Sequence, residues 1–376
     1  MQKDKNIRPS TYQYFKILSN HLAGDLTKIF NGKIVYPRQL EIHLPADHKK
    51  PCNFNCFYCQ GRILDRSLRA FELEGLELVN KLKGKVPYMI YGGAYSEPMM
   101  NPYLMSFLAT TKKYGSYFGI HTNGSLLKTL EDSQGWLTEL CRIATSPNDY
   151  LSVSLDAGTP ESHSKTKNLD RNWFDEIIEG IKIAVKIRGK SDSPAIRVCY
   201  LMNQANSSKK EIKGIIKIMK DIKVDSLRFS IPYDIYGKDF SEVKKYRDSI
   251  EVEQWEENEA MLKPLMSKKK EKPFIFYISP FCQDIERMNF KQCIYSYYQI
   301  TLAADGYIYK CSSTATPSFA MNRLGKITSN LKEFEKMILI NHNSKFCPQT
   351  CFIKGGRCNR MALEINSEWQ KLNEKN

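Results

Sequence analysis

Six short apolar segments rich in β-branched and aromatic residues recur along the chain, with helical patterns between them. They span residues 40–46, 88–93, 118–124, 151–157, 195–202 and 226–233. One helical pattern carries a single apolar stripe formed by Trp173, Phe174, Ile177, Ile178, Ile181 and Val185. Strands that alternate with helices form parallel sheets joined by right-handed crossovers. The chain is therefore predicted to adopt an α/β fold whose sheet can curl into a partial barrel.

Polar residues and glycines follow several of these predicted strands. The segments are "YGGAYSEP" after the second strand, "HTNG" after the third and "SLDAGTPE" after the fourth. Parallel α/β folds place their active sites at the carboxyl ends of their strands. We therefore expect the functional residues at these three strand ends.

Three cysteines crowd into the segment "PCNFNCFYCQGR", which follows the first predicted strand. They are Cys52, Cys56 and Cys59. A structural zinc site needs four protein ligands, and a disulfide framework needs an even number of thiols and an oxidising compartment. Three thiolates instead suit an iron–sulfur cluster that leaves one iron open for another ligand.

The composition predicts a soluble cytoplasmic protein. The N-terminal segment has no apolar signal region, and no apolar run approaches the ~18 residues of a membrane span. Eleven cysteines in a reducing compartment favour metal binding over disulfides. The formal net charge of +15 would suit nucleic acid or acidic redox partners, but the excess lysines are dispersed in a pattern typical of solvated helix faces, so nucleic acid is not the expected ligand.

The pattern changes after about residue 240, where a charged helical linker precedes a cysteine-bearing tail. The segment from Cys293 to Cys311 reads as two strands around a turn at Asp305-Gly306, a hairpin that would bring the two thiols together. Further cysteines of the tail are Cys282, Cys347, Cys351 and Cys358. Tetrahedral thiolate sites suit zinc as well as iron, so a zinc site in the tail stays open. Cys141 and Cys199 read instead as small hydrophobic residues within a helix and a strand.

The C-x3-C-x2-C spacing after the first strand of a β/α fold resembles the radical S-adenosylmethionine superfamily. The resemblance implies a partial (β/α)6 TIM-like barrel, a [4Fe–4S] cluster on Cys52, Cys56 and Cys59, and S-adenosylmethionine on the open iron. The tail resembles the SPASM or twitch auxiliary domain. The predicted division is a helical extension at 1–39, a core domain at 40–245, a linker at 246–285 and an auxiliary domain at 286–376.

The resemblance also implies cofactor-binding residues at the strand ends. They are Tyr58 near the adenine, Gly92 and Gly93 toward the methionine ammonium, Thr122 and Asn123 at the third strand, and Ser154 and Asp156 toward the carboxylate or ribose. Ala94 replaces the acidic residue of the family's Gly-Gly-Glu turn, and Glu97 follows three positions later as a ligand or a turn cap. Asn123 and Asp156 have strand-end capping as their alternative role. Asn203 and Arg228 are further candidates by position alone.

In the tail, the resemblance implies one auxiliary [4Fe–4S] cluster. Its expected ligands are Cys293, Cys311, Cys347 and Cys351, with Cys358 or Cys282 as substitutes. Such a cluster can accept the electron left on a substrate radical or anchor the substrate, so the expected reaction is a net oxidation or modification of a sugar, an aminocyclitol or a peptide. Only 51 residues precede Cys52, which lowers the expectation of a fused leader-peptide module.

Several alternatives remain at this stage. A peptide epimerase or crosslinking enzyme and a methyltransferase belong to the same chemistry, whereas an iron–sulfur electron carrier or a metal-stabilised RNA-binding protein belongs to another class. The basic surface is compatible with an acidic flavodoxin or ferredoxin as reductant. Fold resemblance does not select the substrate.

Overall fold

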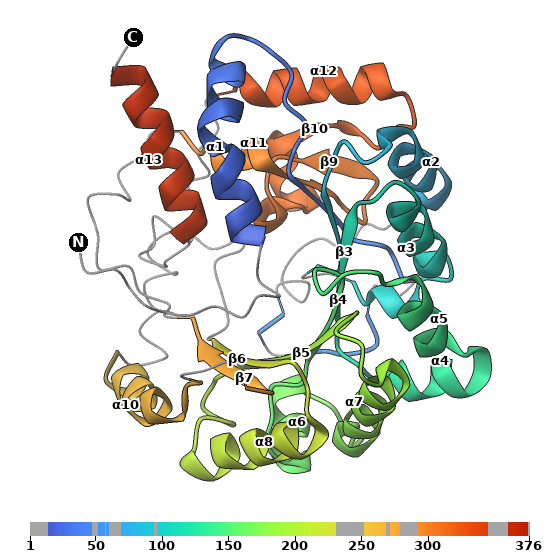
Figure 1. The fold of residues 1–376 in the computed structure, drawn as a ribbon, viewed down its shortest axis with the longest axis vertical. Coiled ribbons are helices and arrows are strands. Elements are labelled where there is room, and N and C mark those ends of the chain that lie inside the picture. The colour runs from blue at the N-terminus through green and yellow to red at the C-terminus, as the bar shows by residue number, and fades with distance from the viewer. Residues whose placement is uncertain are drawn as a thin grey trace. The chain divides into compact units, whose positions relative to one another are not determined.

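The computed structural model describes residues 14–46, 52–56, 58–59, 69–93, 96–230, 252–267, 271–278, 292–344 and 360–374. The chain divides into two compact units. The middle unit contains residues 123–230 and 252–278, and the flanking unit contains residues 16–122 and 292–374 among those described. Figure 1 shows their helices and strands.

The middle unit is a parallel sheet with helices between its strands. Its strands β4, β5, β6 and β7 pair side by side and in parallel. The strands are β4 Tyr150–Ser154, β5 Ala195–Leu201, β6 Ser226–Ser230 and β7 Phe274–Tyr277. The helices are α4 Leu127–Gln134, α5 Trp136–Ile143, α6 Pro160–Lys167, α7 Phe174–Arg188, α8 Lys209–Ile222, α10 Val252–Leu262 and the 3-10 turn η4 Lys263–Leu265.

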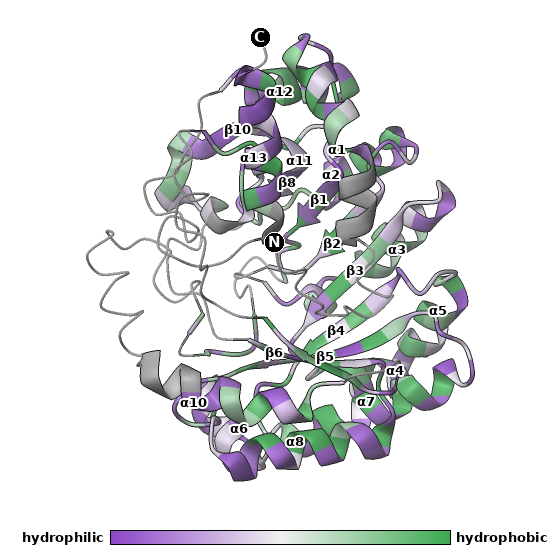
Figure 2. Cartoon of the chain, turned by 60° about the vertical axis from the view of Figure 1, so that its left-hand side comes forward, coloured by the Kyte–Doolittle hydropathy of each residue, from purple (hydrophilic) through white to green (hydrophobic). Residues whose placement is uncertain are grey.

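Sequence patterns explain these elements well. Leu151, Val153 and Val198 are fully buried in adjacent strands, as expected for a parallel sheet covered by helices. Helix α6 begins with a capping box between Thr159 and Ser162. Figure 2 shows hydrophobic residues alternating with hydrophilic ones along α7 and α8, which is the pattern of helices with one buried face.

The flanking unit joins segments from both ends of the chain in one sheet. Strand order is β10-β9-β8-β1-β2-β3, with parallel pairing of β8, β1, β2 and β3 and antiparallel pairing of β8, β9 and β10. The strands are β1 Gln39–Ile42, β2 Tyr88–Tyr91, β3 Tyr117–Thr122, β8 Gln299–Leu302, β9 Tyr307–Tyr309 and β10 Arg323–Lys326.

Helices from both ends of the chain also belong to the flanking unit. They are α1 Tyr14–Phe30, α2 Glu72–Leu82, α3 Leu104–Lys113, α11 Tyr295–Tyr298, α12 Leu331–His342 and α13 Arg360–Glu374, with 3-10 turns η3 Pro98–Met100, η6 Ser312–Thr314 and η7 Pro317–Asn322. Helices α1 and α13 lie side by side (Figure 1), where Phe30 and Trp369 pack edge to face. Within the described ranges, every helix is too short or too polar to cross a lipid bilayer.

The α/β prediction is confirmed, and all six predicted strands are present as β1 to β6. The prediction of a helical linker at 246–285 was wrong in one part, because β7 lies within it and pairs with β6. The predicted hairpin is confirmed as β8 and β9, with Gly306 N–H donating to Ala303 O across the turn. Its first strand also pairs with β1, so tail and core share a sheet in the flanking unit.

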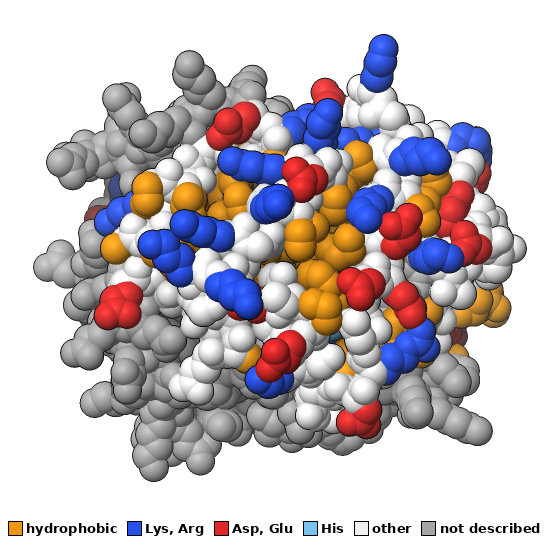
Figure 3. Space-filling view, turned by 90° about the horizontal axis from the view of Figure 1, so that it is seen from below, with side chains coloured by type: hydrophobic (Ala, Val, Ile, Leu, Met, Phe, Trp, Pro, Cys, Tyr) orange, Lys and Arg blue, Asp and Glu red, His pale blue; other side chains and the backbone are white. Residues whose placement is uncertain are grey.

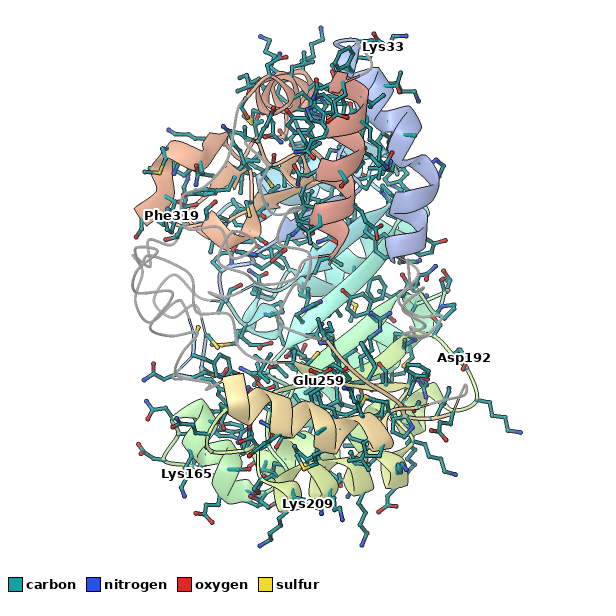
Figure 4. All side chains as sticks on the ribbon, turned by 90° about the vertical axis from the view of Figure 1, so that its left-hand side faces the viewer. Lys33, Lys165, Asp192, Lys209, Glu259 and Phe319 are labelled. Atoms are coloured by element: carbon teal, nitrogen blue, oxygen red, sulfur yellow. The ribbon has the colours of Figure 1, made fainter. Side chains whose placement is uncertain are left out.

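The charge pattern agrees with the interpretation of dispersed lysines. On the face seen in Figure 3, Lys and Arg side chains are interspersed with Asp and Glu. Lys165 and Lys209 extend outward from α6 and α8 in Figure 4. Charges of mixed sign on one face produce no extended field of a single sign.

Candidate functional site

The cysteine segment follows β1 in the flanking unit. Its described part contains a tight turn in which Cys59 N–H donates to Cys56 O at 3.0 Å. The Sγ of Cys52 accepts from Phe54 N–H at 3.4 Å. The pKa of the Cys52 thiol is raised to about 12, mainly by burial and then by the Glu97 carboxylate and the other two thiols. The hydrogen bond from Phe54 N–H lowers this pKa but does not offset the increase. The three thiols are therefore close enough to act on one another.

A raised pKa keeps the Cys52 thiol protonated at neutral pH. Binding of an iron–sulfur cluster would remove this proton, because cysteine binds metal as the thiolate. Among the described residues, no three Cys, His, Asp or Glu side chains are already arranged as the ligands of one metal ion. Three thiols within one short loop are nevertheless the donor set that a [4Fe–4S] cluster with an open iron uses. The residues fit that cofactor by the chemistry of their thiols and by their spacing on one short loop.

Gly92 and Gly93 end β2 and pass close to two neighbouring segments. Their φ angles are +150° and +156°, which L side chains rarely adopt. A Cβ on Gly92 would lie 2.7 Å from His121 Cβ, and one on Gly93 would lie 2.6 Å from His43 Cγ. Only glycine fits at these two positions, so this turn presents bare backbone as the resemblance implies. Ala94 lies outside the described residues.

Glu97 is a turn cap in the structure. Its Oε1 accepts from Met99 N–H at 3.1 Å at the start of η3, and from the Thr122 hydroxyl at 2.6 Å. Glu97 and Thr122 are 2% and 3% exposed. The two side chains therefore tie the end of β3 to the turn after β2. Of the two roles open from the sequence, capping is the one the contacts support.

Asn123 begins the middle unit and shapes the turn after β3. Its Oδ1 accepts from Ser125 N–H at 2.9 Å and from the Ser125 hydroxyl at 2.7 Å. A short polar side chain that accepts from the backbone two residues on is a standard turn-forming group. This agrees with the expectation that Asn123 redirects the chain at the strand end.

Asp156 lies at the end of β4 and is bound on both oxygens by protein donors. Oδ1 accepts from Leu201 N–H at 2.7 Å, and Oδ2 accepts from the Ser154 hydroxyl at 2.7 Å and from Lys167 Nζ at 2.5 Å. The Asp156 and Lys167 side chains are 0% and 1% exposed. The ion pair explains why a charge is tolerated at this depth. The contacts of Asp156 with Ser154 and Leu201 thus fix the backbone at the end of β4. The contact of Ser154 and Asp156 with a cofactor stays a prediction.

The loop after β5 is also hydrogen-bonded to Asp156, through Asn206. Asn206 Nδ2 donates to Asp156 O at 2.7 Å, and its Oδ1 accepts from Asn203 N–H at 2.7 Å. Asn203 in turn donates to Leu201 O at 3.2 Å. Asn203 is therefore a loop-shaping residue here, while Arg228 is half-buried on β6.

Cys293 and Cys311 flank the β8–β9 hairpin. Cys293 is 7% exposed, and Cys311 is half-buried. Both thiols act on one side chain, Tyr295, whose pKa is raised well above its ordinary value by burial first and then by Cys311, Glu41 and Cys293. The remaining predicted ligands Cys347, Cys351 and Cys358, and the substitute Cys282, lie outside the described residues.

Sequence reasoning missed a polar group beside this hairpin. Glu41 accepts from Gln299 Nε2 at 2.7 Å on Oε2, and its Oε1 pairs with His43 Nε2 at 2.8 Å. Tyr295 donates its hydroxyl to Gln299 Oε1. The sequence did contain a signal for this group. Polar and apolar residues alternate in "LEIHLPA" and "QITLA", which places Glu41, His43 and Gln299 on one face of otherwise apolar strands.

Residues 50–206 match the family model described as the Radical SAM superfamily. This segment is similar to the radical SAM superfamily. The match begins two residues before Cys52 and ends beyond Asn203, so it contains the three thiols of the loop and all the predicted cofactor-binding residues. Proteins of that superfamily use a [4Fe–4S] cluster and S-adenosylmethionine as cofactors.

Individual relatives of the radical SAM segment are distant. The chain is 26% identical over 205 residues to a probable GTP 3′,8-cyclase of Sulfurisphaera tokodaii, covering 53% of this chain and 59% of that protein. It is 26% identical over 195 residues to a protein named GTPase Obg of Brachyspira hyodysenteriae, covering 48% of this chain and 26% of that protein. The chain thus spans little more than half of the first relative and about a quarter of the second.

A solved structure shares the fold. The structure of Streptococcus suis SuiB bound to S-adenosylmethionine is similar with a TM-score of 0.51 and 14% identity, covering 79% of this chain and 65% of SuiB. At this identity the likeness concerns the fold alone. It agrees with the parallel-dominated α/β architecture described above.

Proposed function

We propose that the protein is a radical SAM enzyme that reductively cleaves S-adenosylmethionine and uses the 5′-deoxyadenosyl radical to abstract a hydrogen atom from its substrate. The observation that carries the proposal is the trio Cys52, Cys56 and Cys59 on the loop after β1, inside the segment that matches the superfamily. When bound there, a [4Fe–4S] cluster supplies the single electron that this cleavage needs.

The protein's own groups would hold S-adenosylmethionine at the strand ends. The bare backbone of Gly92 and Gly93 offers carbonyl oxygens, which are the acceptors that an ammonium group needs. Tyr58 follows Cys56 on the loop and offers a ring toward the adenine. In the flanking unit, the contact with Glu97 fixes Thr122 at the end of β3. In the middle unit, Asn123 fixes the turn that follows β3, and the Ser154–Asp156 contact fixes the end of β4. Each of these fixed strand ends would present its predicted cofactor-binding side chain in one orientation.

We propose further that the tail carries an auxiliary [4Fe–4S] cluster on Cys293, Cys311, Cys347 and Cys351. When bound, such a cluster supplies an acceptor for the electron left on the substrate radical, and the net change is an oxidation or modification of a sugar, an aminocyclitol or a peptide. Support comes from the β8–β9 hairpin, because Cys293 precedes β8 and Cys311 follows β9 in this antiparallel pair. A flavodoxin or ferredoxin is the proposed reductant.

The test is anaerobic reconstitution followed by iron and sulfide counts and an assay of 5′-deoxyadenosine formed with dithionite. We expect about eight irons per chain in the wild type. Cys52→Ala/Cys56→Ala/Cys59→Ala should retain about four irons and form no 5′-deoxyadenosine. Cys141→Ala is the matched control, because its thiol lies on α5 outside both predicted sites and should change neither result.

The outcomes separate the parts of the proposal. Zinc in the tail with about four irons elsewhere would refute the auxiliary cluster and leave the radical enzyme intact. A fully loaded wild type that forms no 5′-deoxyadenosine would refute the enzyme and favour an electron carrier. S-adenosylhomocysteine as the product would indicate a methyltransferase.

A further inference from the structure

The turn at Gly92 and Gly93 lies between the ends of two neighbouring strands. On the β1 side, Gly92 N–H donates to Ile42 O at 3.2 Å, and the ring of His43 lies against Gly93. On the β3 side, a Cβ on Gly92 would lie 2.9 Å from the carbonyl oxygen of His121. Because groups are close on both sides, a shift of either neighbour would displace the turn.

The His43 side chain meets the turn with the face of its ring. A Cβ built on Gly93 would lie 2.3 Å from His43 Cδ2, 2.5 Å from Nε2 and 2.6 Å from Cγ. Three adjacent ring atoms at nearly equal distances indicate contact over the flat face, because an approach in the plane of the ring would reach one or two atoms well before the third. Rotation of the ring about its Cβ–Cγ bond would turn its edge toward Gly93. The position of the turn thus depends on the plane of this ring.

Glu41 sets the plane of the ring. The torsion about the Cβ–Cγ bond of histidine is broad, so rotamer preference alone does not fix it. His43 Nε2 lies 2.8 Å from Glu41 Oε1, and an ionised carboxylate only accepts, so Nε2 is assigned as the donor. Glu41 is held on its other oxygen, where Oε2 accepts from Gln299 Nε2 at 2.7 Å. The backbone of His43 is held as well, because its N–H donates to Leu302 O at 2.9 Å.

An apolar ring would fill the same space at a lower cost in free energy. His43 is 1% exposed, and a buried polar group costs free energy unless it is hydrogen-bonded. Its ring face lies against a glycine, which has no side chain to bond to. What an imidazole adds over an apolar ring is therefore the bond to Glu41 and the fixed plane that follows from it.

We infer that Glu41 and His43 are positioning residues for S-adenosylmethionine: Glu41 sets the plane of the His43 ring, and the ring holds the turn where its carbonyl oxygens can accept from the methionine ammonium. The inference rests on the proposed function, in which the backbone of Gly92 and Gly93 binds that group. A hydrogen bond weakens steeply when its distance and angle depart from the optimum, so a displaced turn binds the ammonium less well.

The test measures the dissociation constant of S-adenosylmethionine by calorimetry on the anaerobically reconstituted protein, with iron counts and circular dichroism to establish loading and folding. Glu41→Leu removes the acceptor of His43 Nε2 and should weaken binding about tenfold. Glu41→Gln should bind within about threefold of the wild type. Its amide can bond to either tautomer of the imidazole, through the carbonyl oxygen or the NH2 group.

A double variant separates positioning from a general weakening of β1. His43→Ala removes the ring and should also weaken binding about tenfold. Glu41→Leu added to His43→Ala should weaken binding no further, because no ring is left to orient. Asp25→Asn is the matched control, since Asp25 is a carboxylate of the same unit, 3% exposed, that pairs with Arg38 at 2.6 Å instead of with His43. It should leave the dissociation constant unchanged.

The outcomes distinguish this inference from the proposed function. Unchanged affinity in Glu41→Leu or in His43→Ala, additive effects of the two, or equal weakening in Asp25→Asn would overturn the inference while leaving the proposed function in place. If Glu41→Leu loads no iron, Glu41→Met replaces it with the same expectation. A loaded wild type that binds no S-adenosylmethionine would overturn the proposed function and this inference together.

Discussion

The middle unit and the flanking unit each hold a carboxylate at a parallel strand, and the two carboxylates have different surroundings. Asp156 is 0% exposed, with both oxygens bound by donors of its own unit, including Lys167. Glu41 retains 17% exposure of its side chain, and its partners continue through Gln299 to Tyr295 and Ser312, which neighbour Cys293 and Cys311 in the sequence. The hydrogen bonds of Asp156 stay within the middle unit, whereas those of Glu41 lead toward predicted metal ligands.

This difference separates a carboxylate whose contacts stay within one strand end from one whose contacts extend toward predicted metal ligands. A carboxylate has about four acceptor positions, and donors of the protein occupy at least three on Asp156 and two on Glu41. A polar network whose bonds all lie around one strand end makes that end rigid, whereas a network that leads to a metal ligand can influence the chemistry of the metal. The carboxyl end of a strand is thus not by itself evidence for cofactor contact.

The largest effect is expected at the Asp156–Lys167 pair. Lys167→Met leaves the Asp156 charge buried without its cation, so the free energy of unfolding should fall by about 3–5 kcal/mol. Urea unfolding followed by circular dichroism measures the change.

The matched control lies on the same helix. Lys165, labelled in Figure 4, pairs with Glu161 at 2.7 Å on the exposed surface, and Lys165→Met should leave the unfolding midpoint unchanged. Equal effects of the two substitutions would refute the distinction between a buried structural pair and a surface pair.

The next effect is expected in the flanking unit at Gly93. Gly93→Ala places a Cβ against the His43 ring, and it forces alanine into a positive φ angle that L residues rarely adopt. The substitution should therefore lower the free energy of unfolding by about 2–4 kcal/mol. His43→Ala removes the ring, so the same alanine should cost less in that background. Thermal unfolding of the four proteins closes the cycle, and a coupling energy near zero would contradict the contact.

Acidification should weaken both units through one buried histidine in each. Burial, which is the largest cause for each, lowers the pKa of His163 and of His342 to about 4. Because the folded pKa lies below the unfolded value of about 6.5, their contribution to stability is present above that value and is lost as the pH falls toward 4.

The expected size is about 2 kcal/mol per histidine between pH 7 and pH 5. Urea unfolding at the two pH values measures it. Replacing His342 by Phe should flatten the pH dependence by that amount, and His21→Phe, at an exposed position on α1, is the control that should not. A His342→Phe protein with the slope of the wild type would contradict the assignment.

The smallest effect is expected at Glu97. Glu97→Gln keeps an acceptor for Met99 N–H and Thr122 but removes the charge, so it should cost about 1 kcal/mol of unfolding free energy. Because Glu97 acts as a cap, the dissociation constant of S-adenosylmethionine, measured by calorimetry on the reconstituted protein, should change less than about twofold. A tenfold weaker binding would show that Glu97 is a cofactor ligand.

The sequence predicted the elements better than their long-range pairing. Apolar, β-rich runs between helical patterns marked β1 to β6 because each run has a local signal. Strand β7 was missed, since its four residues sit among lysines and glutamates typical of a linker. The parallel pairing of β1 with β8 joins residues far apart in the chain, and no local pattern encodes such a partner.

The candidate site divides in the same way. The spacing of Cys52, Cys56 and Cys59 specifies chemistry directly, and a family match now covers it. The hydrogen bonds that Asp156 accepts from Lys167 and Leu201 are tertiary contacts, so the sequence left its capping and cofactor roles open. Gln299 became visible only through its three partners, which come from three separate segments.

The pairing of β1 with β8 has a consequence for synthesis of the chain. About 260 residues separate the two strands, and at ribosomal rates this is a delay of roughly 15 to 50 s. During that time one edge of β1 has no partner from the tail, and an unpaired edge is a template for association with other chains. The yield of soluble protein should therefore depend on how quickly translation reaches residue 302 and on what protects β1 until then.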